Sequence, residues 1–402
     1  MTNDRCRVGG AGRGLAVAAS MLALVACGSS PLPVASEVTE PDPDSATALE
    51  STVPVTDPTA TGATLADAAP AGSGPEVVTG DEWRDVTANL AGLESECGNV
   101  SFVSAHPATD QVMVGIARQG LWQLTPRADR WDRLGIAAES DAIRNRTAWI
   151  AYDPEQPDRF WESGSYDIGA FRTDDGGSTF TQLGDAEHFD GIGVDLADPE
   201  RRTLLAGRHE QTELYRSDDG GTTWTMVHGY PLDAGFPSSP VVIDADTFLV
   251  GTQGAEESGV YRSDDGGERW TLVRSGNYPY PPVVDGESFF WLSDSSIMVS
   301  GDGGATFSLT GQAPRGRSAS LAMAAGEVLV ALGQQKLVVS YDRGRAWEEV
   351  GPPLPFEPVG LAYSSGRNEV YVWRFTCDKS TRGENSVSTE SIQAIELVVD
   401  RS

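Results

Sequence analysis

The sequence predicts an all-β fold, a single seven-bladed β-propeller of four-stranded blades whose last blade is closed by the N-terminal strand. The first observation is an eight-residue motif, Ser-x-Asp-x-Gly-x-Thr-Trp, that recurs five times with substitutions. Its Asp positions are 44, 46, 37 and 40 residues apart, the length of one four-stranded blade. The second observation is that helix-length amphipathic patterns are scarce. The five motif carboxylates are Asp175, Asp219, Asp265, Asp302 and Asp342.

Each motif has the composition of a tight turn between two strands. The Asp carboxylate can accept hydrogen bonds from backbone N–H groups of its own turn, and the Gly two residues later takes a positive φ without steric cost. The aromatic residue that follows begins the next strand and packs its ring beneath the turn. We therefore interpret all five Asp residues as structural rather than catalytic.

A count of aromatic outer strands extends the repeat to seven blades. Six such strands begin at Trp131, Phe180, Trp224, Trp270, Phe307 and Trp347. A seventh pattern lies at the front of the domain, at residues 82–87. The C-terminus supplies strands near residues 359–363, 369–375 and 391–399, with no Trp strand after them. The N-terminal strand around Trp83 should therefore complete the last blade and remove the free edges of an open sheet.

The five motifs resemble the Asp-box, or bacterial neuraminidase, repeat. This repeat occurs in sialidases, xyloglucan-type glucanases, the sortilin ectodomain and photosystem II assembly factors, so the resemblance implies a fold far more than a function. It also implies that each box joins the third and fourth strands of a blade, on the side away from the active site.

The N-terminus resembles a bacterial lipoprotein signal. Three Arg residues precede an apolar run at residues 15–26, which is too short to span a bilayer. The run ends in Leu-Val-Ala-Cys at residues 24–27, which resembles a lipobox. This resemblance makes residues 1–26 a signal peptide and Cys27 the lipidated N-terminus of the mature chain; an ordinary secretory signal beside a Cys is the alternative.

The segment that follows has the composition of a flexible tether. Residues 27–80 are rich in Pro, Ala, Thr and acidic residues and contain no basic or aromatic residue. Such a segment cannot bury enough apolar surface to offset its ordering entropy, so we expect it to be disordered. The propeller, residues 81–402, would then be held outside the cytoplasm, close to the bacterial cell membrane, by the lipid anchor.

Two cysteines remain once Cys6 leaves with the signal peptide and Cys27 is assigned to lipid. In the predicted topology Cys97 and Cys377 both follow strands of the seventh blade and lie on the same face at the seam of the ring. An oxidising compartment favours a disulfide between them. Two free thiols are the alternative.

The formal net charge of −30 excludes nucleic acid and anionic lipid surfaces as partners of the domain as a whole. No pattern indicates a cofactor, and we expect a monomer. Two His and two carboxylates in the loops of one blade could hold a metal ion, but no tight ligand spacing supports a metal site.

Ligand binding in a propeller normally uses the face formed by the loops from each fourth strand to the next first strand, and from second to third strands. Arg side chains there could bind a carboxylate in bidentate fashion, and Tyr rings could stack on sugars or side chains. The candidates from these loops are Arg144, Arg146, His188, Asp190, Arg208, His209, Glu210, Tyr278 and Tyr280. A wider set on the same loops includes Arg118, Glu162, Tyr166, Asp167, Tyr230, Glu256, Glu257, Arg315, Arg317 and Arg374.

These features predict a non-catalytic module that binds or scaffolds a protein or glycan ligand. Sialidase chemistry needs a cluster of Arg residues, a Tyr nucleophile with a Glu partner and an acid/base Asp, and the motif that typically carries the first of these Arg residues is absent. Xyloglucan-type glucanases use two tandem propellers, whereas this chain has room for one. Among the relatives, the single-domain size and lipid anchor resemble the photosystem II assembly factors. The alternative is a glycoside hydrolase, with a pair such as Asp190 and Glu210 as acid and base.

Overall fold

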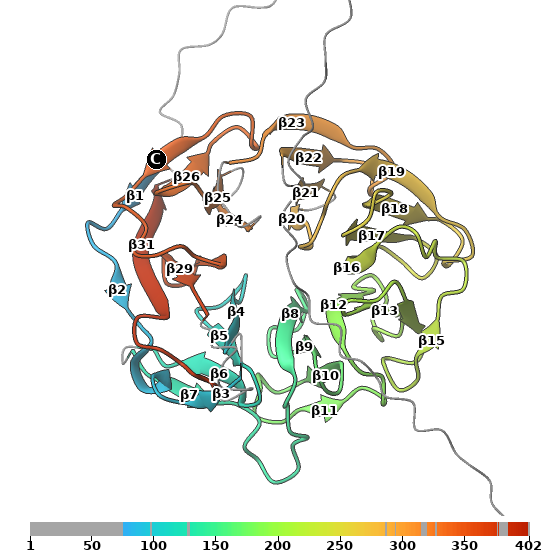
Figure 1. Cartoon of the computed structure of the whole chain (residues 1–402), viewed down its shortest axis with the longest axis horizontal. Helices are drawn as coiled ribbons and strands as arrows, with labels where there is room; N and C mark the ends of the chain where they lie inside the picture. Colours follow the sequence, from blue (N-terminus) through green and yellow to red (C-terminus); the bar gives the residue numbers. More distant parts are fainter. Residues whose placement is uncertain are drawn as a thin grey trace, which may run out of the picture. The chain divides into compact units, whose positions relative to one another are not determined.

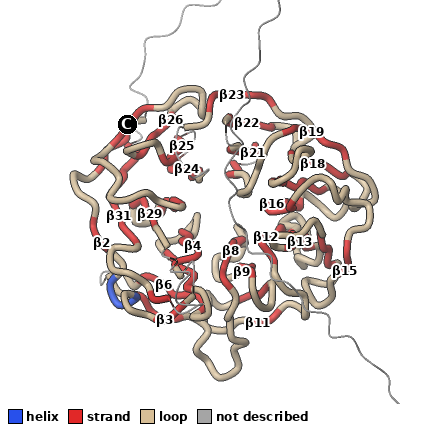
Figure 2. Tube along the Cα trace, in the orientation of Figure 1, coloured by secondary structure: helices blue, strands red, loops and turns tan. Residues whose placement is uncertain are grey.

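The computed structural model describes residues 75–96, 99–126, 129–285, 288–293, 295–314, 320–325, 328–375, 377 and 385–400. All of them belong to one compact unit, Ala68–Ser402. Figure 1 shows the sheets of this unit arranged around a common centre, and Figure 2 shows that strands and loops make up nearly all of it. In the described part of the chain the single helix is the short 3₁₀ turn η1 (Ala88–Leu90). No helix in that part is long and apolar enough to cross a membrane.

Seven antiparallel sheets form the blades, which we number in chain order; six have four strands, and the last has a fourth strand and a short fifth one on the same edge. Blade 1 contains β4 (Val100–Ala105), β5 (Val112–Ile116), β6 (Gly120–Leu124) and β7 (Trp131–Arg133). Blade 2 contains β8 (Arg146–Tyr152), β9 (Phe160–Ser165), β10 (Ala170–Thr173) and β11 (Thr181–Gln182). Blade 3 contains β12 (Phe189–Val194), β13 (Leu204–Arg208), β14 (Leu214–Ser217) and β15 (Thr225–Met226). Blade 4 contains β16 (Phe236–Val242), β17 (Phe248–Gln253), β18 (Gly259–Ser263) and β19 (Thr271–Ser275).

The remaining three blades complete the ring. Blade 5 contains β20 (Val283–Asp285), β21 (Ser288–Leu292), β22 (Ser296–Ser300) and β23 (Ser308–Gln312). Blade 6 contains β24 (Leu321–Ala325), β25 (Val328–Leu332), β26 (Leu337–Ser340) and β27 (Glu348–Val350). Blade 7 contains β28 (Gly360–Ser364), β29 (Glu369–Trp373), β31 (Ile392–Asp400) and β1 (Glu76–Thr79). The predicted seven-bladed fold is thus confirmed, and six outer strands begin at the predicted aromatic residue or one residue after it.

The N-terminal strand closes the last blade as predicted, but the closing strand lies further upstream than expected. β1 pairs with β31 from Glu76 opposite Asp400 to Thr79 opposite Leu397. It therefore precedes residue 81, where the sequence placed the start of the propeller. The segment around Trp83 contributes only the two-residue strand β2 (Arg84–Asp85), which pairs with the first half of β31. β31 is nine residues long and has room for both strands, which together cover its free edge.

Further contacts tie the N-terminal segment to the ring. The Trp83 indole donates a hydrogen bond to the Pro353 carbonyl (2.9 Å). The fully buried Trp131 of blade 1 donates from its indole to the Val86 carbonyl (2.7 Å). The short strands β3 (Glu94–Ser95) and β30 (Asn385–Ser386) pair with each other next to the seam. The N-terminal segment thus connects blade 7 to blade 1.

The Asp-boxes form the turns between the third and fourth strands of their blades, as the resemblance implied. In the box of blade 3, Asp219 Oδ1 accepts from the Thr223 backbone N–H (2.8 Å) and from the Ser217 hydroxyl (2.8 Å). Gly221 takes a φ of +92° and donates its N–H to the Ser217 hydroxyl (2.9 Å). In blade 5 the equivalent hydrogen bonds, led by that of the Thr306 hydroxyl, lower the pKa of Asp302 to about 2. Every donor to these carboxylates is local, which fits a structural role.

Candidate ligand-binding site

Most of the predicted binding residues lie at one end of the blades. Strand directions alternate within each antiparallel sheet, so the loops from strands two to three and from four to the next first strand emerge together. The Asp-boxes emerge at the opposite end, because they join strands three and four. Five loops of blades 1 to 3 supply the site. The loop before β6 carries Arg118, and the loop before β8 carries Arg144. The loops before β10, β12 and β14 carry Tyr166 and Asp167, His188, and His209 and Glu210, respectively.

A cavity of about 490 Å³ opens among these loops. Glu96, Arg118, Arg144, Tyr166 and Asp167 line it. Arg118 Nε forms an ion pair with Glu96 Oε2 at 2.9 Å. Arg144 is exposed and has no ion pair or hydrogen bond within the described residues. The cavity therefore offers a guanidinium without a protein counter-ion, an exposed phenol and two carboxylates.

His209 connects the wall of this cavity to blade 3. Its Nδ1 lies 2.6 Å from Asp190 Oδ1, and its Nε2 lies 3.0 Å from the Tyr166 hydroxyl. The Tyr166 and His209 rings meet edge to face, with 4.9 Å between centroids and 82° between planes. The structure thus brings together two predicted residues, His209 and Asp190, and a tyrosine from the wider set.

Backbone hydrogen bonds join the loops that carry these side chains. The Tyr166 N–H donates to His188 Nδ1 (2.9 Å), and the His188 N–H donates to the Asp167 carbonyl (3.1 Å). The His209 N–H donates to the His188 carbonyl (2.6 Å). His188 therefore acts as a bridge between the loops of blades 2 and 3 and fixes the position of Tyr166 relative to His209.

Four loop residues at this site have left-handed backbone conformations. Their φ values are +65° at Arg118, +67° at Tyr166, +63° at His188 and +52° at Glu210. Bulky side chains adopt this region rarely, because their Cβ atoms crowd the backbone there. Strained conformations of this kind concentrate at functional sites, where the surrounding structure holds them in place.

The charges around His209 favour its protonated form. Burial opposes protonation, but the hydrogen bond and charge of Asp190, together with the charge of Glu210, raise the pKa of the His209 imidazole above its ordinary value. Burial raises the pKa of the Tyr166 phenol as well, and the carboxylates of Glu210, Asp190 and Glu96 act in the same direction.

A buried acid–amide pair, Glu162 and Asn145, connects two of the loops that form the site. Asn145 lies between the two candidate arginines at positions 144 and 146, and its Nδ2 donates to the Ile168 carbonyl (2.9 Å) and to Glu162 Oε2 (3.1 Å). The Asn145 amide packs over Gly164, where any Cβ would lie 2.5 Å from the amide carbon. The pair therefore links the β9–β10 loop, which carries Tyr166, to the segment before β8.

Glu162 is fully buried in β9 and its environment favours the neutral acid. Burial raises its pKa from 4.5 to about 8, against the opposing effect of its hydrogen bonds with Asn145 and Thr147. Glu162 Oε1 and Asn145 Oδ1 are both buried and have no hydrogen-bond partner among the described residues. A protonated carboxyl group can donate as well as accept, so the neutral acid suits buried surroundings in which both of these oxygens lack a donor.

The other predicted residues have different surroundings. The Arg146 guanidinium lies over the Phe375 ring, 5.6 Å from its centroid. Arg208 reaches the Tyr215 hydroxyl at 3.4 Å, within blade 3. Tyr278 is only 1% exposed and packs against Trp291 in the core, so its ring is not available on the surface, whereas Tyr280 is 39% exposed.

Sequence reasoning did not select Glu96, although it lies just after β3 and directly beside Cys97. An isolated acidic residue in a short loop gives no signal of its own. Cys377 is disulfide-bonded, but Cys97 lies outside the described residues, so the pairing of these two cysteines stays a prediction. Cys27 and the predicted signal peptide also lie outside the described residues, as does the tether as far as residue 74.

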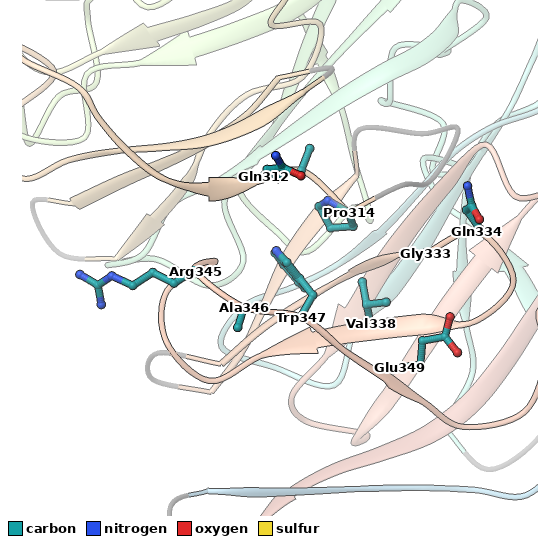
Figure 3. Close-up of a pocket in the computed structure, with 10 residues that line it drawn as sticks. Gln312, Pro314, Gly333, Gln334, Val338, Arg345, Ala346, Trp347 and Glu349 are labelled. Atoms are coloured by element: carbon teal, nitrogen blue, oxygen red, sulfur yellow. The ribbon is translucent and has the colours of Figure 1, made fainter.

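A second cavity of about 490 Å³ lies between the outer strands of blades 5 and 6 (Figure 3). Its walls include Gln312 at the end of β23, Pro314 just after that strand and Trp347 just before β27, with the Trp347 ring beneath Pro314 in this view. Its ionisable residues, Arg345 and Glu349, are both exposed. We therefore take the first cavity, where ionisable side chains form a connected and partly buried cluster, as the candidate site. Among the described residues, no three His, Cys, Asp or Glu side chains group as metal ligands would.

No family model matches the sequence, and no curated protein matches it. Solved structures match at the level of the fold. The GH74 enzyme of Niastella koreensis has a TM-score of 0.54 at 15% identity, over 72% of this chain and 52% of that one. The extracellular domain of a putative hybrid two-component system from B. thetaiotaomicron has a TM-score of 0.50 at 10% identity, over 79% and 40%. YCF48 bound to D1 peptide has a TM-score of 0.48 at 13% identity, over 76% and 99%.

The chain spans about half the length of the GH74 structures that it matches. At these identities the likeness shows the propeller fold alone. Function must therefore be argued from the site.

Proposed function

We propose that this protein is a lipid-anchored, extracytoplasmic propeller that binds a protein or glycan ligand in the cavity lined by Arg118, Arg144 and Tyr166. The observation that carries this proposal is Arg144, an exposed guanidinium that has no counter-ion within the described part of the chain and lines the same cavity as the exposed ring of Tyr166. In a chain with 59 acidic and 29 basic residues, an arginine without a carboxylate partner is available to a ligand.

The cavity suits a ligand with both donors and acceptors. Arg144 can form two parallel hydrogen bonds to a carboxylate or to neighbouring hydroxyls. Glu96 and Asp167 can accept from amides or sugar hydroxyls, and the Tyr166 ring can stack on a sugar or a side chain. The formal charge of −30 disfavours polyanions, which leaves polypeptide segments and glycans as the fitting classes.

The anchoring part of the proposal rests on the N-terminal sequence. The run ending at Cys27 resembles a lipobox, and the acidic, Pro-rich residues after it have the composition of a flexible tether. A propeller held in this way would meet ligands near the outer face of the membrane as a monomer, without a bound cofactor.

The glycoside hydrolase alternative requires two carboxylates that flank a scissile bond. The pair considered from sequence does not suit this role well. Asp190 is engaged with His209 at 2.6 Å, whereas the Glu210 side chain is 73% exposed. We therefore favour binding over glycoside hydrolysis.

The test combines binding and turnover in the full-length protein. Glycan arrays and peptide libraries should identify a ligand whose affinity falls about tenfold or more in Arg144→Ala, since a hydrogen bond to a charged group is worth about 1.5–3 kcal/mol. Arg133→Ala is the matched control, because Arg133 is exposed on the outer strand β7 and should leave affinity unchanged. Equal affinities in both variants would contradict the site. Hydrolysis of sialosides or β-glucans that is lost in Asp190→Ala or Glu210→Ala would establish the hydrolase instead.

A further inference from the structure

Tyr166, His209 and Asp190 form a connected chain of hydrogen bonds from three separate segments. Tyr166 comes from the β9–β10 loop, Asp190 from β12, and His209 directly follows β13. The distances are 3.0 Å from the Tyr166 hydroxyl to His209 Nε2 and 2.6 Å from His209 Nδ1 to Asp190 Oδ1. Ligand binding alone does not require a base held in this position.

The carboxylate decides the tautomer of the neutral histidine. An ionised Asp190 can only accept, so the Nδ1 atom of His209 carries the proton between them. Nε2 then presents its lone pair to the Tyr166 hydroxyl. A hydroxyl, a base within hydrogen-bond reach and a third group that orients the base together make up the arrangement that activates nucleophiles in covalent catalysis.

The three hydrogen-bonded side chains differ in solvent exposure, as a nucleophile and its buried base would. Tyr166 is 49% exposed and lines the cavity. The His209 and Asp190 side chains are only 19% and 20% exposed. The Tyr166 side chain is therefore open to a molecule in the cavity, whereas the base and its partner are largely buried.

The phenol is also held in place by its backbone. Tyr166 has a φ of +67°, and its N–H donates to His188 Nδ1 at 2.9 Å. A fixed backbone and an edge-to-face contact with His209 limit the positions of the ring, which keeps the hydroxyl near the base. This strained and over-determined position is the kind found where chemistry takes place.

We propose that Tyr166 is a nucleophile with His209 as its general base and Asp190 as a positioning residue, and that the site transfers acyl groups from carboxylic esters. The Tyr166 oxygen forms a bond to the ester carbonyl carbon while its proton moves to His209 Nε2. The carbon–oxygen bond to the alcohol then breaks, and the alcohol leaves with the proton from His209. Water repeats the sequence on the tyrosyl ester, which releases the carboxylic acid and restores the phenol. Arg144, in the same cavity, supplies positive charge for the developing oxyanion.

The charged and titratable groups around His209 set the pH range of this activity. They come from each element packed against the ring: Asp190 of β12, Glu210 of its own loop, Tyr166 of the β9–β10 loop and Arg146 of β8. The carboxylates favour the imidazolium and Arg146 opposes it, so the free base predominates only above a raised pKa. The rate should rise with pH through that pKa and then level off.

The test uses 4-nitrophenyl acetate with the full-length protein and follows release of 4-nitrophenolate. The wild type should release it about 100-fold faster than Tyr166→Phe, which removes one exposed hydroxyl and keeps the ring contact with His209. Tyr341→Phe is the matched control, because Tyr341 is partly exposed and lies just after β26 at the Asp-box end of blade 6, away from the cavity; its rate should equal the wild-type rate. Early acid quenching and peptide mass spectrometry should find acetyl groups on Tyr166 ahead of Tyr341.

His209→Gln and Asp190→Asn should both lose most of this activity. His209→Gln should abolish the inflection in the pH profile, whereas Asp190→Asn should move it to lower pH, because the carboxylate that raises the pKa of His209 is gone. Circular dichroism melting identifies a variant that fails to fold, in which case Tyr166→Phe and the wild-type pH profile decide the question. Equal release by wild type and Tyr166→Phe would overturn the proposal, as would a wild-type rate without the inflection. These outcomes are independent of ligand binding through Arg144, which Tyr166→Phe leaves in place.

Discussion

Replacing Glu162 by Gln tests whether the buried acid beneath the site is neutral. Glu162 is fully buried, and neither its Oε1 nor Asn145 Oδ1 has a hydrogen-bond partner among the described residues. A Gln side chain carries one donor group and one acceptor oxygen, like the protonated acid, and can still accept from Asn145 Nδ2 without an ionisable group. We expect Glu162→Gln to fold and to lose one component of the pH dependence of stability.

The direction of the pKa shift determines whether stability rises or falls with pH. The folded state raises the pKa of Glu162 from 4.5 to about 8, so between these values it binds a proton that the unfolded chain does not. The free energy of unfolding therefore falls as pH rises from about 4.5 to about 8 and is constant beyond. At about 1.4 kcal/mol per pH unit the loss is about 5 kcal/mol. This is large beside a typical total stability of about 5–15 kcal/mol.

The assay is urea unfolding of full-length wild type and Glu162→Gln at pH 5, 6, 7, 8 and 9. The difference between the two free energies isolates this one group, because every other titrating residue is common to both proteins. The free energy of unfolding of Glu162→Gln, relative to that of the wild type, should increase by several kcal/mol between pH 5 and pH 8. Glu349→Gln is the control, since Glu349 is exposed on β27 and should leave the slope unchanged. A difference that stays constant with pH would refute the reasoning.

Two further predictions concern the anchor and the seam of the ring. Wild-type protein should fractionate with membranes, whereas Cys27→Ala should release the chain; unchanged mass and partitioning in the variant would count against lipidation. Nonreducing peptide mapping should find Cys97 bonded to Cys377, and a bridge closing a loop of this length contributes about 4–5 kcal/mol in the chain-entropy description. Detection of both cysteines as free thiols would exclude it.

Several features could be predicted because their causes are local in the chain. The Asp-box turn needs only a carboxylate, a glycine and a hydroxyl within a few residues, as the bonds of Asp219 to Ser217 and Thr223 show. Such a turn can therefore be recognised from the sequence alone. Its spacing then sets the blade length, and the count of outer strands sets the number of blades. The closing strand was harder to place, because β1 has no aromatic residue and depends on the length of β31 for its partner.

The candidate site was only partly predictable. Loop connectivity placed His209, Asp190 and Arg144 at the same end of the blades, where the structure has them, but any soluble surface has scattered charges, so nothing in the sequence indicated their grouping. Tyr278 belonged to the same candidate set, yet its ring is buried against Trp291 in the core. Which side of a strand or loop faces solvent depends on the neighbouring blade, and residue type alone does not reveal it.

The sequence by itself determined the ring, its seven blades and the structural role of the Asp-boxes, because these follow from short-range hydrogen bonding repeated at a regular spacing. Tertiary structure alone decided which side chains meet at the opposite face. Tyr166, Asp190 and His209 come from three separate segments. The packing of blade 2 against blade 3 brings the phenol to the imidazole, and the pairing of β12 with β13 brings the imidazole to the carboxylate. The same packing buries Glu162 and favours its protonated form, because the energy of a charge depends on the three-dimensional surroundings that desolvate it.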